Sequence, residues 1–351
     1  MFKKRTLFVV GAGASAEYNL LQGAGLAKLI GAKTRVTPDD GYNGPITGDK
    51  DILARLINVD RARINDYLAA ARIISEGVEL SSSIDDFLDI HSGNADVRTV
   101  GKVAIVKAIL EQEQGSPLFV DRSNCNNRLR VSMIENTWLI KLVRLLGRGV
   151  SRERIGDIFA NVAFIVFNYD RCIEHALYFA LQQLYSVDGR VAAQIIDRLS
   201  IIHPYGKVGD LRTETKTGGL AFGGERTRIH PDYLNVSEGI STYTEEMSAA
   251  DQLAAIRHYF EITEQIVFLG FAYHDQNMKL LKPTNAIEPK KVFGTAYGMS
   301  DSDVEIVKNQ ILHFFPEAEW GRIMHEKGID IRNDNLKCAD FIDQYGRTLS
   351  G

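Results

Sequence analysis

The chain of 351 residues contains only three cysteines, Cys125, Cys172 and Cys338, and they lie far apart. No CxxC pair occurs, which excludes a zinc ribbon built from four cysteines, and so few cysteines are typical of a reducing compartment. The sequence also has no HExxH motif, no paired histidines at metal-binding spacing and no carboxylate cluster. We therefore expect no metal site, and no zinc in particular.

Excess basic charge and long apolar runs are also missing. The formal net charge is −4, whereas proteins whose main partner is nucleic acid favour a basic surface. No apolar run approaches the roughly 20 residues needed to span a bilayer. Residues 3–16 loosely imitate a secretory signal, but the apolar run is short and contains two glycines, so a buried first strand is the better interpretation. We expect a cytoplasmic protein that does not enter membranes and does not bind nucleic acid directly.

The clearest feature that is present is a glycine turn near the N-terminus. Residues 6–17 read TLFVVGAGASAE, in which an apolar run leads directly into glycines. This predicts a strand over residues 7–10 and a helix over 14–30 that breaks or restarts near 23–25. The turn matches the loose dinucleotide pattern GxGxxA, in which glycines let the backbone approach a pyrophosphate. Glycine turns between strand and helix are common, however, and a purely structural turn stays open.

A hydride-transferring dehydrogenase is disfavoured by the next segment. Such an enzyme needs a second strand about 20 residues after the glycines, ending in an acidic residue that holds the ribose. Lys33 and Arg35 stand at that distance without a convincing strand, and Asp39 and Asp40 fall in a loop predicted over residues 37–51.

The middle of the chain predicts helices, and the last part alternates strands with helices. Helical patterns cover residues 52–74, 97–114 and 131–146, and Ser83 with Asp86 forms a helix-start signal. Residues 163–170 and 200–206 predict strands, QIVFLGFAYHDQN at 265–277 predicts a strand that ends in a turn and a new helix, and KKVFGTAYG at 290–298 predicts a fourth strand of this part. Residues 171–184, 244–260 and 303–314 predict helices. Residues 218–229 predict a glycine-rich loop or hairpin. The expected fold class is α/β, with a Rossmann-like parallel sheet, helices on both faces and an inserted helical module.

Polar or glycine residues follow each predicted strand, and in such sheets ligands bind beyond the carboxyl ends of the strands. FNYD places Asn168 and Asp170 at one strand end, where an amide can hold a sugar hydroxyl or water. Asp170 can equally be a helix cap. His203, at the next strand end, is the candidate general base, and His274 competes for that role but is better explained as a helix start. Ser15 lies in GASAE rather than GxSxG, which disfavours a hydrolase nucleophile.

Taken together, GAGAS, SIDDFL, FNYD, the histidine strand end, IVFLGFAYHDQN and GTAYG resemble the sirtuin-like family, in particular bacterial sirtuin-like domains that act as antiphage effectors. The resemblance spans about residues 7–314 and implies a Rossmann-like domain that binds NAD. It implies that Asn168 orients a ribose hydroxyl or the attacking water, that Asp170 lies near the carboxamide, and that His203 is the base. It further implies that the dinucleotide is held by Gly11, Ala12, Gly13, Ser15, Gly270, Phe271, Gly294 and Thr295.

The sequence departs from the sirtuin deacylases in the parts that bind peptide. It cannot form their four-cysteine zinc module, and Leu20 to Ala24 replace their GIPDFR-like stretch. We therefore expect an NAD⁺ glycohydrolase that releases nicotinamide and ADP-ribose, with NAD as substrate. The resemblance also implies a homo-oligomer and a partner defence protein that acts as sensor or regulator. An NAD-dependent protein deacylase and a sensor that binds NAD or ADP-ribose without cleavage remain alternatives.

The expected domain covers residues 1–315, with the helical insertion at about 31–160. Residues 316–351 form a C-terminal extension with a short amphipathic helix over 336–345, packed on the domain or at an oligomer interface.

Overall fold

A parallel six-stranded sheet forms the centre of the molecule in the computed structural model. The structure describes residues 2–36, 47–121, 124, 128–225, 232–246, 250–285, 287–326, 328–332 and 334–351. The strands lie in the order β3-β2-β1-β4-β5-β6, and every pair of neighbours is parallel. Their bounds are β1 Thr6–Val10, β2 Val162–Val166, β3 Ser200–Ile202, β4 Gln265–Leu269, β5 Lys291–Thr295 and β6 Ile329–Arg332. The expected α/β class with a Rossmann-like sheet is confirmed.

The central strands are buried on both faces, which explains their unbroken apolar sequences. Every residue of β1, β2 and β4 is buried. Because successive side chains point to opposite faces, Leu7 and Val9 join one hydrophobic cluster while Phe8 and Val10 join the other. Each face therefore needs its own cover of helices.

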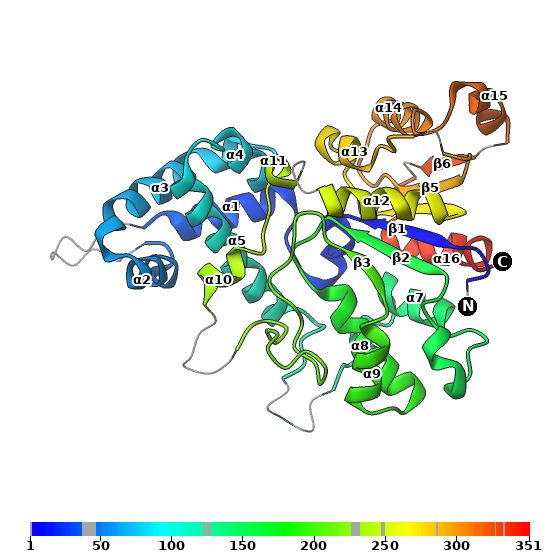
Figure 1. The fold of residues 1–351 in the computed structure, drawn as a ribbon, viewed down its shortest axis with the longest axis horizontal. Coiled ribbons are helices and arrows are strands. Elements are labelled where there is room, and N and C mark those ends of the chain that lie inside the picture. The colour runs from blue at the N-terminus through cyan, green and yellow to red at the C-terminus, as the bar shows by residue number, and fades with distance from the viewer. Residues whose placement is uncertain are drawn as a thin grey trace.

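Helices cover both faces, as Figure 1 shows. One face is covered by α12 Ala250–Ile262, α13 Asp275–Leu281 and α14 Asp301–Leu312. The opposite face is covered by α7 Trp138–Leu146, α8 Cys172–Tyr185, α9 Gly189–Ile196 and α16 Cys338–Ser350.

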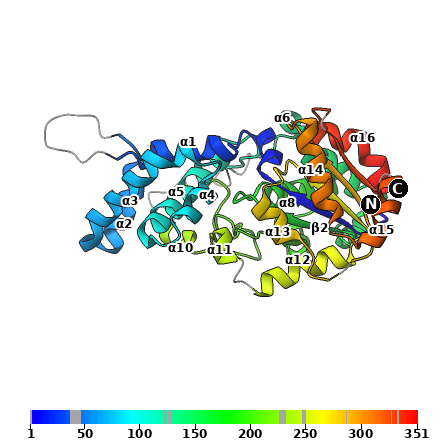
Figure 2. The same cartoon turned by 90° about the horizontal axis from the view of Figure 1, so that it is seen from above.

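A helical lobe extends from one end of the sheet (Figures 1 and 2). It consists of α1 Gly23–Thr34, α2 Lys50–Val59, α3 Ile64–Gly77, α4 Ile84–Ile90 and α5 Ala95–Gly115, with α10 Tyr233–Ser237 packed on α5 and α11 Tyr243–Glu246 beside α4. Ser83 caps α4 by accepting from the Asp86 amide, as its sequence predicts. The described residues between 52 and 160 contain no strand, which agrees with the sequence pattern.

The expected insertion at 31–160 divides into two structural parts. Helices α2 to α5 belong to the lobe, whereas α6 Val131–Ile134 and α7 follow them in sequence and α7 covers the sheet. Of the predicted loop at 37–51, residues 37–46, including Asp39 and Asp40, lie outside the described residues, and α2 already begins at Lys50. Cys125 also lies outside them.

Two other expected elements are confirmed in part. The predicted restart of the helix near residues 23–25 is confirmed, because α1 begins at Gly23, but the part predicted before it is replaced by the short 3-10 turns η1 Ala12–Ala14 and η2 Ala16–Tyr18. Asn19 adopts a left-handed φ of 66°, which interrupts helical hydrogen bonding. Of the loop or hairpin predicted over residues 218–229, the described part is a loop without a hairpin; Leu220 makes an isolated parallel bridge with Leu211.

The C-terminal segment completes the sheet domain. It contains α15 Glu317–His325, strand β6 and helix α16. β6 pairs with β5, and Gln265 Nε2 donates to the Leu349 carbonyl at 2.9 Å. The segment thus packs on the sheet of its own chain, and it adds a strand that the sequence did not predict. No helix in the described ranges is both long and apolar enough to cross a membrane.

Candidate functional site

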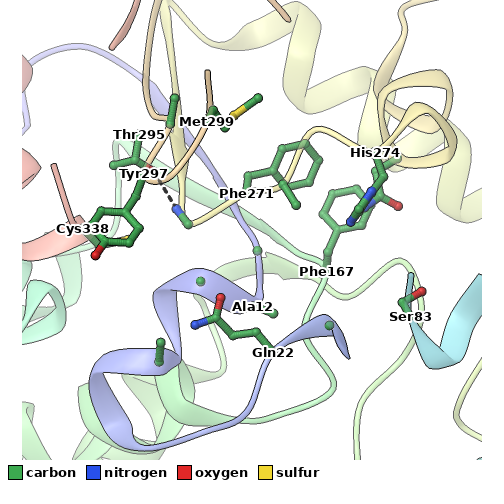
Figure 3. Close-up of a pocket in the computed structure, with 18 of the residues that line it drawn as sticks. Ala12, Gln22, Ser83, Phe167, Phe271, His274, Thr295, Tyr297, Met299 and Cys338 are labelled. Carbon is green, nitrogen blue, oxygen red and sulfur yellow. Dashed lines mark hydrogen bonds between the residues drawn. The ribbon is translucent and has the colours of Figure 1, made fainter. Parts of the chain in front are cut away.

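A cavity of about 670 Å³ opens between the turns that follow β1 and β4 (Figure 3). Strands β2 and β3 lie on one side of β1, whereas β4, β5 and β6 lie on the other. The space between β1 and β4 is therefore the switch point of the sheet, where open α/β sheets bind their ligands. The size of the cavity is within the roughly 300–1,000 Å³ usual for small-molecule sites.

The floor of the cavity is made by two glycine turns that pack directly on each other. Gly13 N donates to the Gly270 carbonyl at 2.9 Å, and Gly11 N donates to the Leu269 carbonyl at 3.0 Å. A Cβ atom on Gly13 would lie 2.7 Å from that Gly270 oxygen, and one on Gly270 would lie 2.1 Å from Ala14 N. Gly270 also has a φ of +56°, a region that favours glycine. These glycines are therefore required for the packing of the protein itself, whatever ligand the turns bind.

A buried hydrogen-bonded cluster lies directly behind the first glycine turn. Ser15 Oγ donates to Asp170 Oδ2 at 2.7 Å and accepts from Asn168 Nδ2 at 2.9 Å. Asn168 Nδ2 also donates to the carbonyl of Gly11, which lines the cavity, at 3.1 Å. Asp170 Oδ1 accepts from Cys172 N, so this carboxylate also caps α8. The chain thus joins the residues predicted from GAGAS and FNYD into one cluster.

His203 extends this cluster toward α8. Its Nδ1 lies 3.0 Å from the Asn168 carbonyl oxygen, and its Nε2 lies 3.1 Å from Glu174 Oε1. Lys207 Nζ donates to the same Glu174 oxygen at 3.0 Å. Burial opposes the ionisation of Glu174, but the charges and hydrogen bonds of His203 and Lys207 outweigh it and lower the pKa of this carboxyl.

A fully buried ion pair between Arg171 and Glu113 lies next to the segment that follows β2. Arg171 Nε and Nη2 donate to the two carboxylate oxygens of Glu113 at 3.1 and 2.5 Å. Arg171 also donates to the carbonyls of Leu220 and Ala221, and Glu113 accepts from Gly223 N at 2.8 Å. The pair therefore ties the end of α5 to the residue after Asp170 and to the loop around residue 220.

The predicted binding residues divide between the cavity wall and the interior. The cavity is lined by Gly11, Ala12, Gly13, Gly270, Phe271 and Thr295. Thr295 Oγ1 accepts from Gly270 N at 2.9 Å, the bond dashed in Figure 3. Gly294 lies beneath the wall, where a Cβ atom would be 2.5 Å from the Tyr273 hydroxyl.

The predicted catalytic residues Asn168, Asp170 and His203, and the predicted dinucleotide-binding residue Ser15, are buried behind the wall. Each of the four is at most 7% exposed, and none of them lines the cavity. Their sequence neighbours Ala16, Phe167 and Tyr205 do line it. His274, the rival to His203, lines the cavity and immediately precedes α13 without a side-chain cap bond.

The sequence did not predict that the helical lobe forms part of the cavity wall. Ser83, Asp85 and Asp86 of the SIDDFL segment line the cavity, and the Tyr169 hydroxyl hydrogen bonds to Asp85. Burial raises the pKa of Asp85 to about 6; the hydrogen bond from Tyr169 opposes this rise and the charge of Asp86 adds to it. The acidic pair is visible in the sequence, but no local signal shows which strand end it reaches.

The sequence also did not predict that the start of α16 forms part of the cavity wall. Leu336, Lys337 and Cys338, at the start of that helix, line the cavity. Glu17 holds this helix end in place, because its carboxylate accepts from Ala339 N at 2.9 Å and from Trp138 N, at the start of α7, at 2.8 Å. Burial raises the pKa of the Cys338 thiol, so the sulfur facing the site stays protonated and is a poor nucleophile.

Among the described residues, no group of three or more histidine, cysteine or acidic side chains is placed to hold a metal ion. The cavity offers a ligand backbone from two glycine turns, aromatic and apolar side chains, acidic groups from the lobe, and further polar side chains that include His274, Asn277 and Lys337. No protein-family model matches this chain, and no curated protein sequence matches it.

Proposed function

We propose that this protein binds NAD⁺ in the cavity between β1 and β4 and hydrolyses its nicotinamide–ribose bond to release nicotinamide and ADP-ribose. The observation that carries the proposal is the position of the Ser15–Asn168–Asp170 cluster, which is hydrogen bonded to Gly11, a residue of the cavity floor at the switch point of the sheet.

One hydrogen-bond acceptor of this cluster is left without a partner by the described residues. Asn168 is 6% exposed, and its Oδ1 has no hydrogen-bond partner among the described residues. Its amide orientation is fixed, because the Gly11 carbonyl can only accept and so must face the nitrogen. A buried acceptor without a partner is costly, and a ribose hydroxyl or a water molecule would satisfy it. This fits the role that the sirtuin resemblance gives to Asn168.

Hydrolysis of the nicotinamide–ribose bond requires the protein mainly to position the substrate and a water molecule. Nicotinamide leaves as a neutral molecule from the cationic pyridinium group of NAD⁺, so the site needs to hold the ribose, stabilise an oxocarbenium-like transition state and orient a water molecule. Asp170 carries a carboxylate behind the glycine turn, and Asp85 carries another on the lobe wall. Negative charge at these two places would favour a positively charged transition state.

A sensor that binds NAD or ADP-ribose without cleaving it is the second candidate. The burial of Asn168, Asp170 and His203 behind the cavity wall favours it, because none of the three lines the cavity.

We further propose that an active hydrolase acts as the regulated effector of an antiphage system, as a homo-oligomer with a partner defence protein, since unregulated NAD hydrolysis would harm the host cell.

The test follows nicotinamide and ADP-ribose by chromatography after incubation of purified protein with NAD⁺, alone and with lysate from phage-infected cells. Asn168→Ala should abolish release. The matched control is Asn161→Ala, which alters the same residue type at the opposite end of β2, where Asn161 Nδ2 donates to the Phe2 carbonyl.

Release that persists in Asn168→Ala would remove the site assignment. Calorimetric binding of NAD⁺ that stays intact under both conditions would select the sensor. Absence of both binding and cleavage would contradict the proposal as a whole.

A further inference from the structure

The surroundings of His203 are unusual for a general base, because both ring nitrogens face oxygen acceptors. Nδ1 lies 3.0 Å from the Asn168 carbonyl and Nε2 lies 3.1 Å from a Glu174 carboxylate oxygen. A backbone carbonyl can only accept, so Nδ1 must carry a hydrogen. A neutral ring would then turn the lone pair of Nε2 toward the carboxylate, which is repulsive.

We propose that His203 is held as an imidazolium by Glu174, and that it acts as a positioning residue for Asn168 rather than as the general base of the reaction. This inference deepens the proposed function, because it concerns the same site and reassigns one of its residues.

The burial of the pair supports a charged partnership. Glu174 is 4% exposed and His203 is 7% exposed, so the acid and the base are removed from water together. An isolated buried carboxylate would be costly, whereas one that accepts hydrogen bonds from an imidazolium and an ammonium group is compensated. Among the described residues, the charged groups at the pair are Lys207, whose Nζ lies 3.0 Å from Glu174 Oε1, and Asp210, which lies 3.4 Å from Lys207 Nζ.

The local fold brings these groups together. Glu174 lies one helical turn after Asp170, near the start of α8, and so faces the same strand end. After β3, the chain turns at Gly206, whose N donates to the His203 carbonyl at 2.9 Å and whose φ is +74°. A Cβ atom at Gly206 would lie 1.8 Å from the Gly239 carbonyl oxygen. Because of this tight turn, Lys207 and His203 both contact the carboxylate of Glu174.

The chain of contacts ends at a buried acceptor that the described residues leave without a partner. The imidazolium donates to the backbone carbonyl of Asn168, and the side chain of that residue has the unpartnered Oδ1. Glu174 orients His203, His203 fixes the backbone of Asn168, and Asn168 presents its acceptor. In this arrangement His203 has no bare nitrogen to take a proton from water.

The first test measures protonation directly and does not depend on activity. The full-length protein, labelled with ¹⁵N-histidine, is examined by long-range ¹H–¹⁵N correlation at pH 8, where an unperturbed histidine is neutral. The signal of His203 is identified among the eight histidines by its loss in His203→Asn.

Two nearly equivalent ring nitrogens at pH 8 are expected for His203, and Glu174→Gln should convert the ring to a neutral form with two distinct nitrogens. A neutral ring in the unmodified protein at pH 8 would overturn the inference, even if NAD⁺ is hydrolysed.

The second test separates positioning from base catalysis. In His203→Asn, the amide nitrogen replaces Nδ1 and keeps a donor toward the Asn168 carbonyl, whereas His203→Ala keeps none. We expect His203→Asn to retain kcat within about tenfold of the unmodified protein. In His203→Ala, kcat should fall about 100-fold or more, a loss as large as that of a general base, so only the comparison of the two variants separates the two roles. Equal loss in both variants, with unchanged circular dichroism, would restore the base role.

Discussion

Two acidic side chains lie near the carboxyl end of β2, and their charges are compensated differently. Glu174 contacts the cationic groups of His203 and Lys207, which lower the pKa of its carboxyl. Asp85 comes from the helical lobe and accepts the neutral hydroxyl of Tyr169. Burial raises the pKa of Asp85 to about 6, and Asp86 and Asp89 add to that rise. The same strand end is therefore bordered by one carboxyl held ionised and one that titrates near neutrality.

Asp85→Asn should change how the free energy of unfolding depends on pH. The usual pKa of this carboxyl is 3.8 and its folded value is about 6, so the folded protein binds more protons between these values. Stability supplied by the protonated form is complete below about pH 4 and is lost as the pH rises to about 6. The unfolding free energy of the unmodified protein relative to Asp85→Asn should fall by about 2 to 3 kcal/mol across this window.

Urea unfolding at pH 4, 5, 6 and 7.5 measures this difference. Asp66→Asn is the control, because Asp66 lies on α3 with its side chain 60% exposed and should leave the pH dependence unchanged. A difference that rises with pH, or stays flat, would show that burial does not raise the pKa of Asp85.

At the scale of elements, the two glycine turns act as one unit. Gly11 and Gly13 approach the backbone of Gly270, and each turn closes the carboxyl end of a neighbouring strand. The same atoms therefore hold β1 to β4 and form the floor of the cavity. A ligand at this floor would contact backbone that is already constrained by sheet packing, which reduces the conformational cost of binding.

Gly270→Ala should destabilise the protein by more than about 2 kcal/mol, because it combines a left-handed φ with a backbone clash at Ala14. The matched control is Gly218→Ala, at a glycine where an added Cβ atom would meet no heavy atom within 4 Å and where φ is not left-handed. That control should change stability by no more than about 0.5 kcal/mol. Equal urea midpoints for the two variants would mean that the turns separate at little cost.

At the scale of the whole molecule, the C-terminal segment is part of the core. Helix α16 buries Phe341, Ile342 and Leu349 against the same sheet face that α7 and α8 cover. Its first residues form a cavity wall, and Glu17 ties it to the first glycine turn. The segment therefore links the integrity of the fold to the shape of the site.

Deleting residues 328–351, which removes β6 and α16, should prevent folding. Loss of three fully buried apolar side chains alone costs about 5 kcal/mol or more, which is comparable to the whole stability of a typical domain. Deleting only residues 350–351 should leave circular dichroism and the thermal midpoint nearly unchanged. A soluble, cooperatively unfolding protein from the longer deletion would contradict the assignment of this segment to the core.

The sequence by itself determined the fold class and most of the elements. Continuous apolar runs specify strands that are buried on both faces, and glycine or capping residues mark their ends locally, so β1, β2, β4, β5 and the cap at Ser83 could be predicted. Strand β6 could not, because its sequence, IDIR, is short and half charged and gains its place only by pairing with β5.

Only the tertiary structure decided which side chains meet at the site. Ser15 and Asp170 are 155 residues apart, Tyr169 and Asp85 are 84 apart, and Ala339 and Glu17 are 322 apart. No local periodicity encodes such pairings, since they depend on strand order and on how the lobe packs. The same reason applies to His203. Its position at a strand end follows from the sequence. Its two contacts, with the Asn168 carbonyl and with Glu174, set its protonation and follow from how β3 and α8 pack.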